Sequence, residues 1–334
     1  MRKNSAFKTI IVIAILCVMP IVLSSFHMSI LSEILIFGVF ALSLNILVGY
    51  TGLVSLGHAA FFGVGAYAAG FVAKNLSANF FLTLLAAILV SVIVSAIIGF
   101  FSTRVSGFYF LMLTLAFSQM IYSFVYQWTS VTGGSNGLSG ITNPNLIGSI
   151  GISNPISLYF LILVVFLLVY FSVKMLLGSP LGKNFVGIRE NETKMKAIGY
   201  NTMLYKNLAF IIAGGFGGVA GCLYTYFNGF VSPSDVYWTM SGSVLMMVII
   251  GGSGTMLGPV LGAGLIILLE TIVSSYTDLS MLIIGVIFIL FVIFAPKGIM
   301  GISEKSTVLF KKKFGQLFSG IRKGSSIQEV QKRE

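Results

Sequence analysis

The sequence predicts an all-α fold, a polytopic bundle of membrane-spanning helices, from its composition and the lengths of its apolar runs. Hydrophobic residues make up 57% of the 334 residues and charged residues only 9%, whereas about a quarter of the residues in soluble domains are charged. The mean hydropathy is +1.00. A helix needs roughly 20 apolar residues to cross a bilayer, so about eight to ten spans with short loops fit in this chain.

Apolar runs that end at glycine, proline and polar residues place these spans along the chain. The predicted spans are 8–26, 30–48, 55–73, 80–102, 107–127, 156–177, 206–228, 238–252, 256–274 and 279–295. The first follows Arg2, Lys3 and Lys8, as the apolar run of a signal peptide does. Because it lacks a small-residue cleavage site and reaches spanning length, we interpret it as a retained span.

Two of the predicted spans are dense in glycine, and their backbone is the least certain to be helical throughout. These glycine-dense segments are 52–70 and 251–264. Glycine permits bends that other residues resist, so each segment could cross the membrane or re-enter it. About eight full spans with two partial ones fit the sequence as well as ten full spans do.

Basic residues favour one side of this arrangement. If the chain starts inside and crosses at every span, the outer side receives only Lys74. The inner side receives Arg2, Lys3, Lys8, Arg104, Lys174, Lys183, Arg189, Lys194, Lys196, Lys206, Lys297, Lys305 and the basic residues between Lys311 and Arg333. The positive-inside rule describes this asymmetry, so we expect both termini in the cytoplasm and the chain in the cytoplasmic membrane of a prokaryote.

This topology also accounts for the net charge of +11, which on a soluble domain would suggest nucleic acid. We expect residues 1–300 to form the membrane domain and residues 301–334 to form a basic cytoplasmic tail. Basic residues are attracted to anionic headgroups by about 1 kcal/mol each. The tail is therefore expected to follow the membrane surface and then to be disordered.

Residues that would support catalysis or metal binding do not form recognisable motifs. The sequence has no His-Glu-x-x-His, no aspartate-rich pair and no Gly-x-Ser-x-Gly elbow. Its two cysteines, Cys17 and Cys222, lie in apolar segments, which excludes a disulfide framework or a cysteine metal cluster. We predict no catalytic residues, no metal site and no cofactor bound by this chain.

An ion-driven carrier would be expected to place paired ionisable groups within the membrane. The candidates are Glu33, His58 and Glu270. Interfacial positions explain both glutamates, because each nears the outer end of a span, and a packing role is favoured for His58. A stand-alone carrier or channel nevertheless stays open as an alternative, and it would transport without an ATPase.

The predicted external loop 128–155 is polar and rich in glycine, asparagine and serine, with the run TGGSNGLSG from Thr132 to Gly140. It is long enough for a small surface structure, and a flexible linker explains its composition equally well.

The segment 181–207 is the most highly charged stretch between predicted spans, and it lies on the predicted cytoplasmic side. Phe185, Ile188, Met195 and Ile198 recur at helical spacing, so they would share one face. The pattern is typical of one or two short amphipathic helices on the inner membrane surface. The alternative is a solvated loop that holds lipid headgroups through its lysines.

Four motifs occur in order along the chain. They are GYTGLVSLGHAAFFGVGAYAAG at Gly49, GIRENETKMKAIGYNTMLYKNLAFIIAGGFGGVAG at Gly187, VIIGGSGTMLGPVLGAG at Val248 and APKGIMG at Ala295. Together they resemble a known family, the permease subunits of ABC importers for branched-chain amino acids. The resemblance runs from about Glu33 to Gly301. Within that family the chain is similar to the longer of two paired permeases, of the high-affinity leucine, isoleucine and valine type.

The resemblance implies a heterodimer with a second, homologous permease, two ATP-binding subunits that hold ATP and Mg²⁺, and an extracytoplasmic solute-binding protein. Branched-chain amino acids would be the substrate. Urea, short amides and other amino acids are alternatives, because importers of this class also carry them.

The resemblance further implies that a coupling segment, about residues 180–205, docks on an ATPase, with Gly187–Tyr200 entering its cleft. The implied coupling residues are Lys183, Gly187, Arg189, Glu190, Glu192, Lys196 and Gly199. The basic ones, Lys183, Arg189 and Lys196, would pair with acids on the ATPase. The chain departs from the Glu-Ala-Ala pattern of better-known importers, because Thr193 and Lys194 follow Glu192 and the glycine comes one residue late.

Small residues allow the close backbone approach on which helix packing in membranes depends. We therefore predict that the segment Gly49–Gly70 forms a wall of the translocation path or an interface between permeases, and packing alone is the alternative. The candidate residues for this role are Asn45, Gly57, His58, Gly63, Gly65, Gly252, Gly254 and Gly258.

Overall fold

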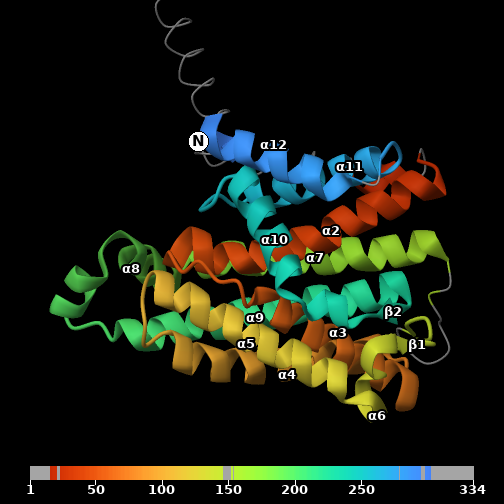
Figure 1. The fold of residues 1–334 in the computed structure, drawn as a ribbon, viewed down its shortest axis with the longest axis horizontal. Helices are drawn as coiled ribbons and strands as arrows, with labels where there is room; N and C mark the ends of the chain where they lie inside the picture. The colour runs from red at the N-terminus through yellow and green to blue at the C-terminus, as the bar shows by residue number, and fades with distance from the viewer. Residues whose placement is uncertain are drawn as a thin grey trace, which may run out of the picture.

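Helices of the predicted spans form one bundle in the computed structural model, which describes residues 16–20, 23–145, 152, 154–277, 279–294 and 298–301 (Figure 1). Their bounds are α2 (Ser25–Asn45), α3 (His58–Asn75), α4 (Phe80–Ser102), α5 (Phe108–Gln127), α7 (Pro155–Gly178), α8 (Pro180–Ala197), α9 (Thr202–Asn228), α10 (Trp238–Gly251), α11 (Gly258–Ser274) and α12 (Ser280–Phe294). A π-helical turn, η1 (Ile46–Thr51), continues α2. The predicted all-α membrane fold is confirmed.

The predicted span bounds agree closely with these helices. The segment 80–102 coincides with α4, and most other bounds differ by only a few residues. Six segments of the described chain are long and apolar enough to cross a bilayer, and α10 and α11 are shorter apolar helices of 14 and 17 residues. Most of the first predicted span, 8–26, and nearly all of the tail 301–334 lie outside the described residues.

Neither glycine-dense segment is a continuous helix. Residues 52–57 are non-helical before α3 begins at His58, and residues 252–257 are non-helical between α10 and α11. Helices of about 20 residues are needed to span hydrocarbon, and α3 has 18. The prediction that these segments bend is confirmed, and both breaks lie at the end of the bundle where α8 lies (Figure 1).

The long helix α9 lies at the centre and packs against α2, α3 and α4. Glycines make this close packing feasible, because a Cβ added to Gly65 of α3 would lie 2.5 Å from the Cα of Gly218 in α9. Hydrogen bonds also join these helices: Ser91 Oγ of α4 donates to the carbonyl of Phe61 in α3 at 2.8 Å, and Tyr226 Oη of α9 donates to Thr83 Oγ1 of α4 at 2.8 Å.

Several of these helices have a polar side chain that caps their N-terminus. Asn79 accepts hydrogen bonds from the first turn of α4, Asn154 caps α7 ahead of Pro155, and Ser179 caps α8 ahead of Pro180. Such caps satisfy backbone N–H groups that have no partner within the helix. They therefore account for where these helices begin.

The predicted external loop, 128–155, forms a small surface structure, which is one of the two alternatives that the sequence left open; the other was a flexible linker. It contains α6 (Thr129–Thr132), η2 (Gly134–Asn136) and β1 (Leu138–Ser139), and residues 146–151 and 153 lie outside the description. Strand β1 pairs antiparallel with β2 (Phe230–Val231), which follows α9 and precedes η3 (Pro233–Val236). This pairing joins the loop after α5 to the loop after α9.

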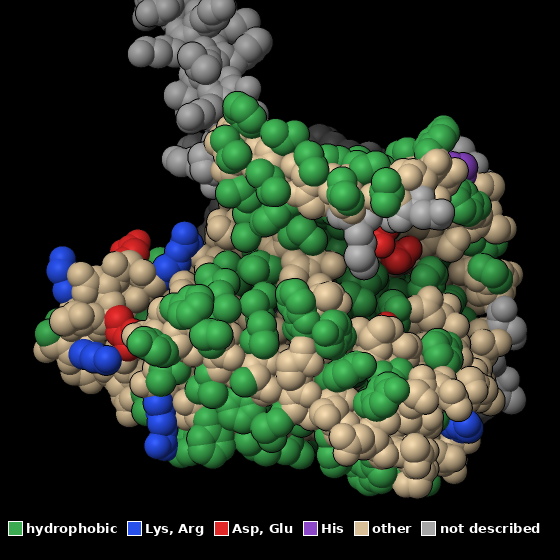
Figure 2. All heavy atoms as spheres, viewed as in Figure 1, with side chains coloured by type: hydrophobic (Ala, Val, Ile, Leu, Met, Phe, Trp, Pro, Cys, Tyr) green, Lys and Arg blue, Asp and Glu red, His purple; other side chains and the backbone are tan. Residues whose placement is uncertain are grey.

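The surface agrees with a membrane location. Hydrophobic side chains cover much of the face that Figure 2 shows, and Lys and Arg side chains gather mainly at the α8 end. Exposed large apolar residues are frequent on α4, for example Leu85 and Leu89 at 53% and 52% exposed. Lipid is the solvent in which such a surface is stable.

Candidate functional site: the inner junction

The second break, 252–257, meets the π-helical turn that leads into the first break, near α8. Helix α2 passes at Asn45 into the π turn, which ends at Gly52 with φ at 78°. The break 252–257 lies against this turn, with the backbone N of Gly254 close to Gly49. We call residues 45–57 together with 251–258 the inner junction. π turns inside helices frequently occur at functional sites.

Asn45 holds the two halves of the inner junction together. Its Nδ2 donates to the carbonyl of Thr255 at 2.9 Å, and its Oδ1 accepts from the N–H of Gly254 at 2.9 Å. The residue is only 1% exposed. A buried amide that pairs both of its polar groups avoids the cost of an unsatisfied group, so Asn45 makes a stable clamp between segments far apart in the sequence.

The glycines of the inner junction leave no room for a side chain. A Cβ on Gly49 would overlap the Asn45 amide and the N–H of Gly254, and a Cβ on Gly258 would overlap Thr255 and the carbonyls of the break. Gly252 and Gly254 have φ of 114° and 80°, which favour glycine. The structure thus brings the predicted residues Asn45, Gly252, Gly254 and Gly258 together.

Arg189 of α8 contacts both halves of the inner junction. Its Nη1 donates to the carbonyl of Gly49, and a Cβ on Gly254 would lie 2.8 Å from the same nitrogen. Gly52 lies under the Arg189 side chain, because a Cβ there would be 3.1 Å from Arg189 Cγ. A cation is favourable at the carbonyl end of a helix, and Arg189 stays solvent-exposed over part of its surface.

The coupling segment contains two short helices, as predicted. Asn191 has φ of −161° and ψ of 95°, so α8 is broken there, and the Asn191 side chain caps the second part through the N–H of Lys194 at 2.9 Å. Phe185 and Ile188 are buried, but Ile198 is 68% exposed. The predicted common face with Ile198 is therefore wrong, because the break at Asn191 turns the second part away.

Glu192 anchors the second part of α8 to α9. Its carboxylate accepts hydrogen bonds from Lys206 Nζ at 2.5 Å and from Thr202 Oγ1 at 3.0 Å, and Lys196 Nζ lies at 3.0 Å. Burial raises the pKa of Glu192, but the hydrogen bonds from Lys206 and Lys196, the charge of Lys206 and the Thr202 hydroxyl lower it to about 2. Since Lys206 is 4% exposed, a charged Glu192 is the partner that its burial requires.

The other predicted coupling residues lie around this anchor. Lys183 and Glu190 are exposed on the first part of α8. Gly187 faces Met195, whose Sδ would be 2.9 Å from an added Cβ, and Gly199 turns the chain toward α9 with φ of 93°. Docking of these residues on an ATPase stays a prediction. The pairing of Lys206 with Glu192 could not be read from the sequence, because nothing there shows that the two side chains meet.

The predicted glycines of α3 pack within this chain. A Cβ on Gly57 would lie 2.7 Å from the carbonyl of Thr114 in α5, and one on Gly63 would overlap Val236 of η3. Gly65 lies against α9, as described above. Close packing thus explains why these positions of the segment Gly49–Gly70 hold glycine. Their part in a translocation path stays a prediction.

His58, at the start of α3, is fully buried against α2. Ser43 Oγ donates to the carbonyl of Phe40 at 2.6 Å, so it accepts from His58 Nε2, 2.8 Å away. This assigns the Nε2–H tautomer. The ring stacks on Phe40 with centroids 5.5 Å apart, and its Nδ1 has no partner among the described residues. The contacts are those of a packing histidine.

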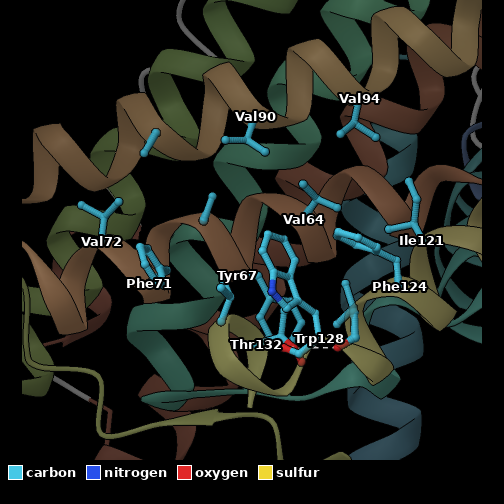
Figure 3. A pocket seen from close by; sticks show the side chains of 14 residues that line it. Val64, Tyr67, Phe71, Val72, Val90, Val94, Ile121, Phe124, Trp128 and Thr132 are labelled. Carbon is cyan, nitrogen blue, oxygen red and sulfur yellow. Dashed lines mark hydrogen bonds between the residues drawn. The ribbon is translucent and has the colours of Figure 1, made fainter. Parts of the chain in front are cut away.

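An apolar cavity of about 370 Å³ lies between α3, α4 and α5, closed at one end by α6 (Figure 3). Val64, Tyr67, Val90, Phe124 and Trp128 are among the residues that line it. Such a lining accommodates hydrocarbon. Sequence analysis missed the cavity, because it is formed by residues of separate helices that are each typical of a lipid-facing or packed surface.

Comparison with known proteins places this arrangement in a family. The family described as "Branched-chain amino acid transport system / permease component" matches residues 26–292. The high-affinity branched-chain amino acid transport system permease protein LivM of Salmonella typhimurium is 30% identical over 319 residues, which cover 89% of this chain and 74% of that protein.

Two further relatives are similar over most of their length. The protein of the same name from Escherichia coli is 29% identical over 84% of this chain and 71% of its own. The probable branched-chain amino acid transport permease protein LivM of Methanocaldococcus jannaschii is 24% identical over 83% of this chain and 94% of its own. No solved structure matches the chain. The match over residues 26–292, with a helical membrane fold throughout, shows that this chain belongs to the family of branched-chain amino acid transport system permease components.

Proposed function

We propose that this chain is the transmembrane permease subunit of an ATP-driven importer that carries branched-chain amino acids across the cytoplasmic membrane of a prokaryote. The family match over residues 26–292 carries the proposal. The position of α8 supports it, because this short charged helix lies at one end of the bundle and touches the loops of the spanning helices through Arg189. A permease that is driven by a separate ATPase needs a segment through which movement of the ATPase is passed to the spanning helices.

The partners in this proposal are a second homologous permease, two ATP-binding subunits and an extracytoplasmic solute-binding protein. ATP and Mg²⁺ bind on the ATPases, and this chain holds no cofactor. The exposed residues Lys183 and Glu190 are available for docking on an ATPase, whereas Glu192 and Lys196 already pair with each other. Arg189 reaches the inner junction and keeps an exposed part that an acidic group on the ATPase can approach.

In this proposal α8 lies in the cytoplasm, together with both termini. The Lys and Arg side chains that gather at the α8 end are what the positive-inside rule expects of the cytoplasmic side (Figure 2). Residues 1–300 are the permease domain in this proposal. The loop joined by β1 and β2 then faces the extracytoplasmic binding protein.

The substrate chemistry is compatible with the chain. A branched-chain amino acid is a zwitterion with an apolar side chain, so a path of small residues and backbone groups with few fixed charges would let it pass without trapping it. Glycine-rich breaks in spanning helices are the kind of feature that lines transport sites in membrane proteins.

The test is transport by the importer in proteoliposomes, assembled from this chain, the second permease, the ATPases and the binding protein. Uptake of labelled leucine should require ATP and the binding protein, and unlabelled isoleucine and valine should compete. Competition by urea or short amides alone would assign a different substrate. Flux through this chain without an ATPase, driven by an ion gradient, would overturn the proposal in favour of a carrier or channel.

A further inference from the structure

We infer that Arg189 and Asn45 are positioning residues that make α8 and both halves of the inner junction move together, so that the inner junction acts as the gate on the α8 side. The inference rests on the proposed function, because a gate matters only to a transporter. It adds to that function the residues through which movement of α8 would reach the spanning helices.

The hydrogen bonds of α8 place its attachments at two points. Among the described residues, the side-chain hydrogen bonds from α8 to the rest of the chain run through Glu192, which bonds Lys206 and Thr202 of α9, and through Arg189, which bonds the carbonyl of Gly49. Phe185 and Ile188 of the first part are also buried. The Glu192 contact is anchored by a buried lysine. The break at Asn191 lies between the two hydrogen-bonded attachments, so Arg189 and Glu192 belong to separate helical parts of α8.

The hydrogen bond of Arg189 and those of Asn45 differ in how easily water can replace them. Arg189 is partly exposed, so water can replace its hydrogen bond at small cost. The Asn45 bonds are buried, and breaking them would leave the N–H of Gly254 and the carbonyl of Thr255 unpaired. The two halves of the inner junction therefore stay together while Arg189 engages or releases them.

Movement of the inner junction would be passed on to the helices that begin there. Helix α3 starts at His58 and α11 at Gly258, directly after the two breaks. The first turn of α3 is also tied to α10, because Ser241 Oγ accepts from the N–H of Ala59 at 2.8 Å. Glycines with positive φ at 52, 252 and 254 let the breaks bend without side-chain strain.

The experiment compares variants in the complete importer in proteoliposomes, with uptake of labelled leucine and ATP hydrolysis measured on the same vesicles. Arg189→Gln should lower uptake at least tenfold while hydrolysis stays within twofold, because α8 still docks but no longer moves the inner junction. Arg189→Lys should restore part of the uptake. Asn45→Asp, which replaces the donor to Thr255 by an acceptor, should uncouple uptake from hydrolysis in the same way.

Arg104→Gln is the matched control. Arg104 is also an exposed arginine, just after α4, and its guanidinium lies 4.3 Å from the centroid of the Phe100 ring in that helix. Its uptake and hydrolysis should equal those of the unchanged importer. Equal uptake in Arg189→Gln would overturn the inference. So would a parallel fall of uptake and hydrolysis with loss of the ATPase during purification, because Arg189 would then be a docking contact.

A distance measurement without substrate separates this inference from the proposed function. Spin labels at the exposed positions Ser253 and Glu190 report the separation of the inner junction from the first part of α8. Arg189→Gln should broaden the distance distribution and Arg104→Gln should not, and an unchanged distribution in Arg189→Gln would overturn the inference. If the distribution broadens but the unchanged importer carries no amino acid, the proposed function fails and the attachment of α8 by Arg189 stands.

Discussion

Asn45 Oδ1 accepts a hydrogen bond from the backbone N–H of Gly254 at 2.9 Å, across a separation of 209 residues. The same side chain donates to the carbonyl of the next residue, Thr255, at 2.9 Å. One amide thus pairs with the backbone of two successive residues, as a neighbouring β-strand would, and holds the end of α2 against the break 252–257. Such a two-point contact fixes both the distance and the orientation of the segments that it joins.

Replacing Asn45 should destabilise the protein measurably. Asn45→Leu removes both hydrogen bonds and leaves the N–H of Gly254 and the carbonyl of Thr255 without a partner, at about 1–3 kcal/mol for each buried group. Thermal unfolding in detergent should show the loss. Asn75→Leu is the control, because the Asn75 amide bonds only an exposed carbonyl one turn away in its own helix. Equal melting temperatures for both variants would contradict the clamp.

The packing of α3 on α9 predicts the effect of enlarging Gly65. Gly65→Ala should cost about 1–3 kcal/mol, the usual cost of overpacking, because the new Cβ meets the Gly218 backbone and Ser91 Oγ at 2.5 and 2.8 Å. Gly242→Ala in α10 is the control, since nothing lies within 4 Å of its added Cβ. That change should stabilise by about 0.5–1 kcal/mol through helix propensity.

Larger side chains at Gly63 and Gly65 test whether the segment Gly49–Gly70 has the predicted role in transport. Gly63→Leu and Gly65→Leu should block uptake in the assembled importer and leave ATPase binding intact, since α8 lies away from these glycines in the bundle. Co-purification of the ATPases measures the second point. Normal uptake by folded variants would show that the segment serves packing alone.

The Glu192 pair predicts a loss of stability at low pH. The pKa of Glu192 is lowered from 4.5 to about 2, so its contribution is present above about pH 4.5 and is lost as the pH falls toward 2. The difference in unfolding free energy between the unchanged chain and Glu192→Gln should be constant from pH 7 to about pH 5 and should shrink as the pH is lowered further toward 3. At pH 7, Glu192→Gln should be less stable by about 1–3 kcal/mol, because buried Lys206 loses its charged partner.

A double-mutant cycle identifies the partner. Glu192→Gln should cost much less when Lys206 is already methionine, because no buried ammonium is then left unpaired. Glu190→Gln, at the exposed neighbouring glutamate, should leave the unfolding curve unchanged. Additive effects of the Glu192 and Lys206 changes would rule out the pair.

Replacement by phenylalanine should affect the stability of the protein differently at two buried tyrosines. Tyr226 Oη donates to Thr83 Oγ1 at 2.8 Å, so Tyr226→Phe should cost about 1 kcal/mol. Tyr67 Oη is buried beside the apolar cavity and has no partner among the described residues. Tyr67→Phe should therefore be neutral or stabilising by up to about 1 kcal/mol. A comparable loss in both unfolding curves would show that the Tyr67 hydroxyl is paired.

Much of the fold could be predicted because helix bounds in a membrane protein follow from local composition. The run 80–102 is mostly apolar and has no charged residue, with polar Asn79 before it and Arg104 after it, and α4 has those bounds. The bends in the two glycine-dense segments were predictable for the same reason. The break at Asn191 was not, because Phe185, Ile188, Met195 and Ile198 keep a helical spacing across it.

By itself the sequence determined that this protein is a helical membrane protein, where its spans begin and end, and to which family of permeases its motifs point. These properties depend on hydropathy and on residues that are close together in the chain. Only the tertiary structure decided that Asn45 bonds Gly254, that Arg189 reaches Gly49 and that Lys206 pairs with Glu192. Such contacts depend on how the helices pack in three dimensions, and one sequence alone carries no direct signal of that packing.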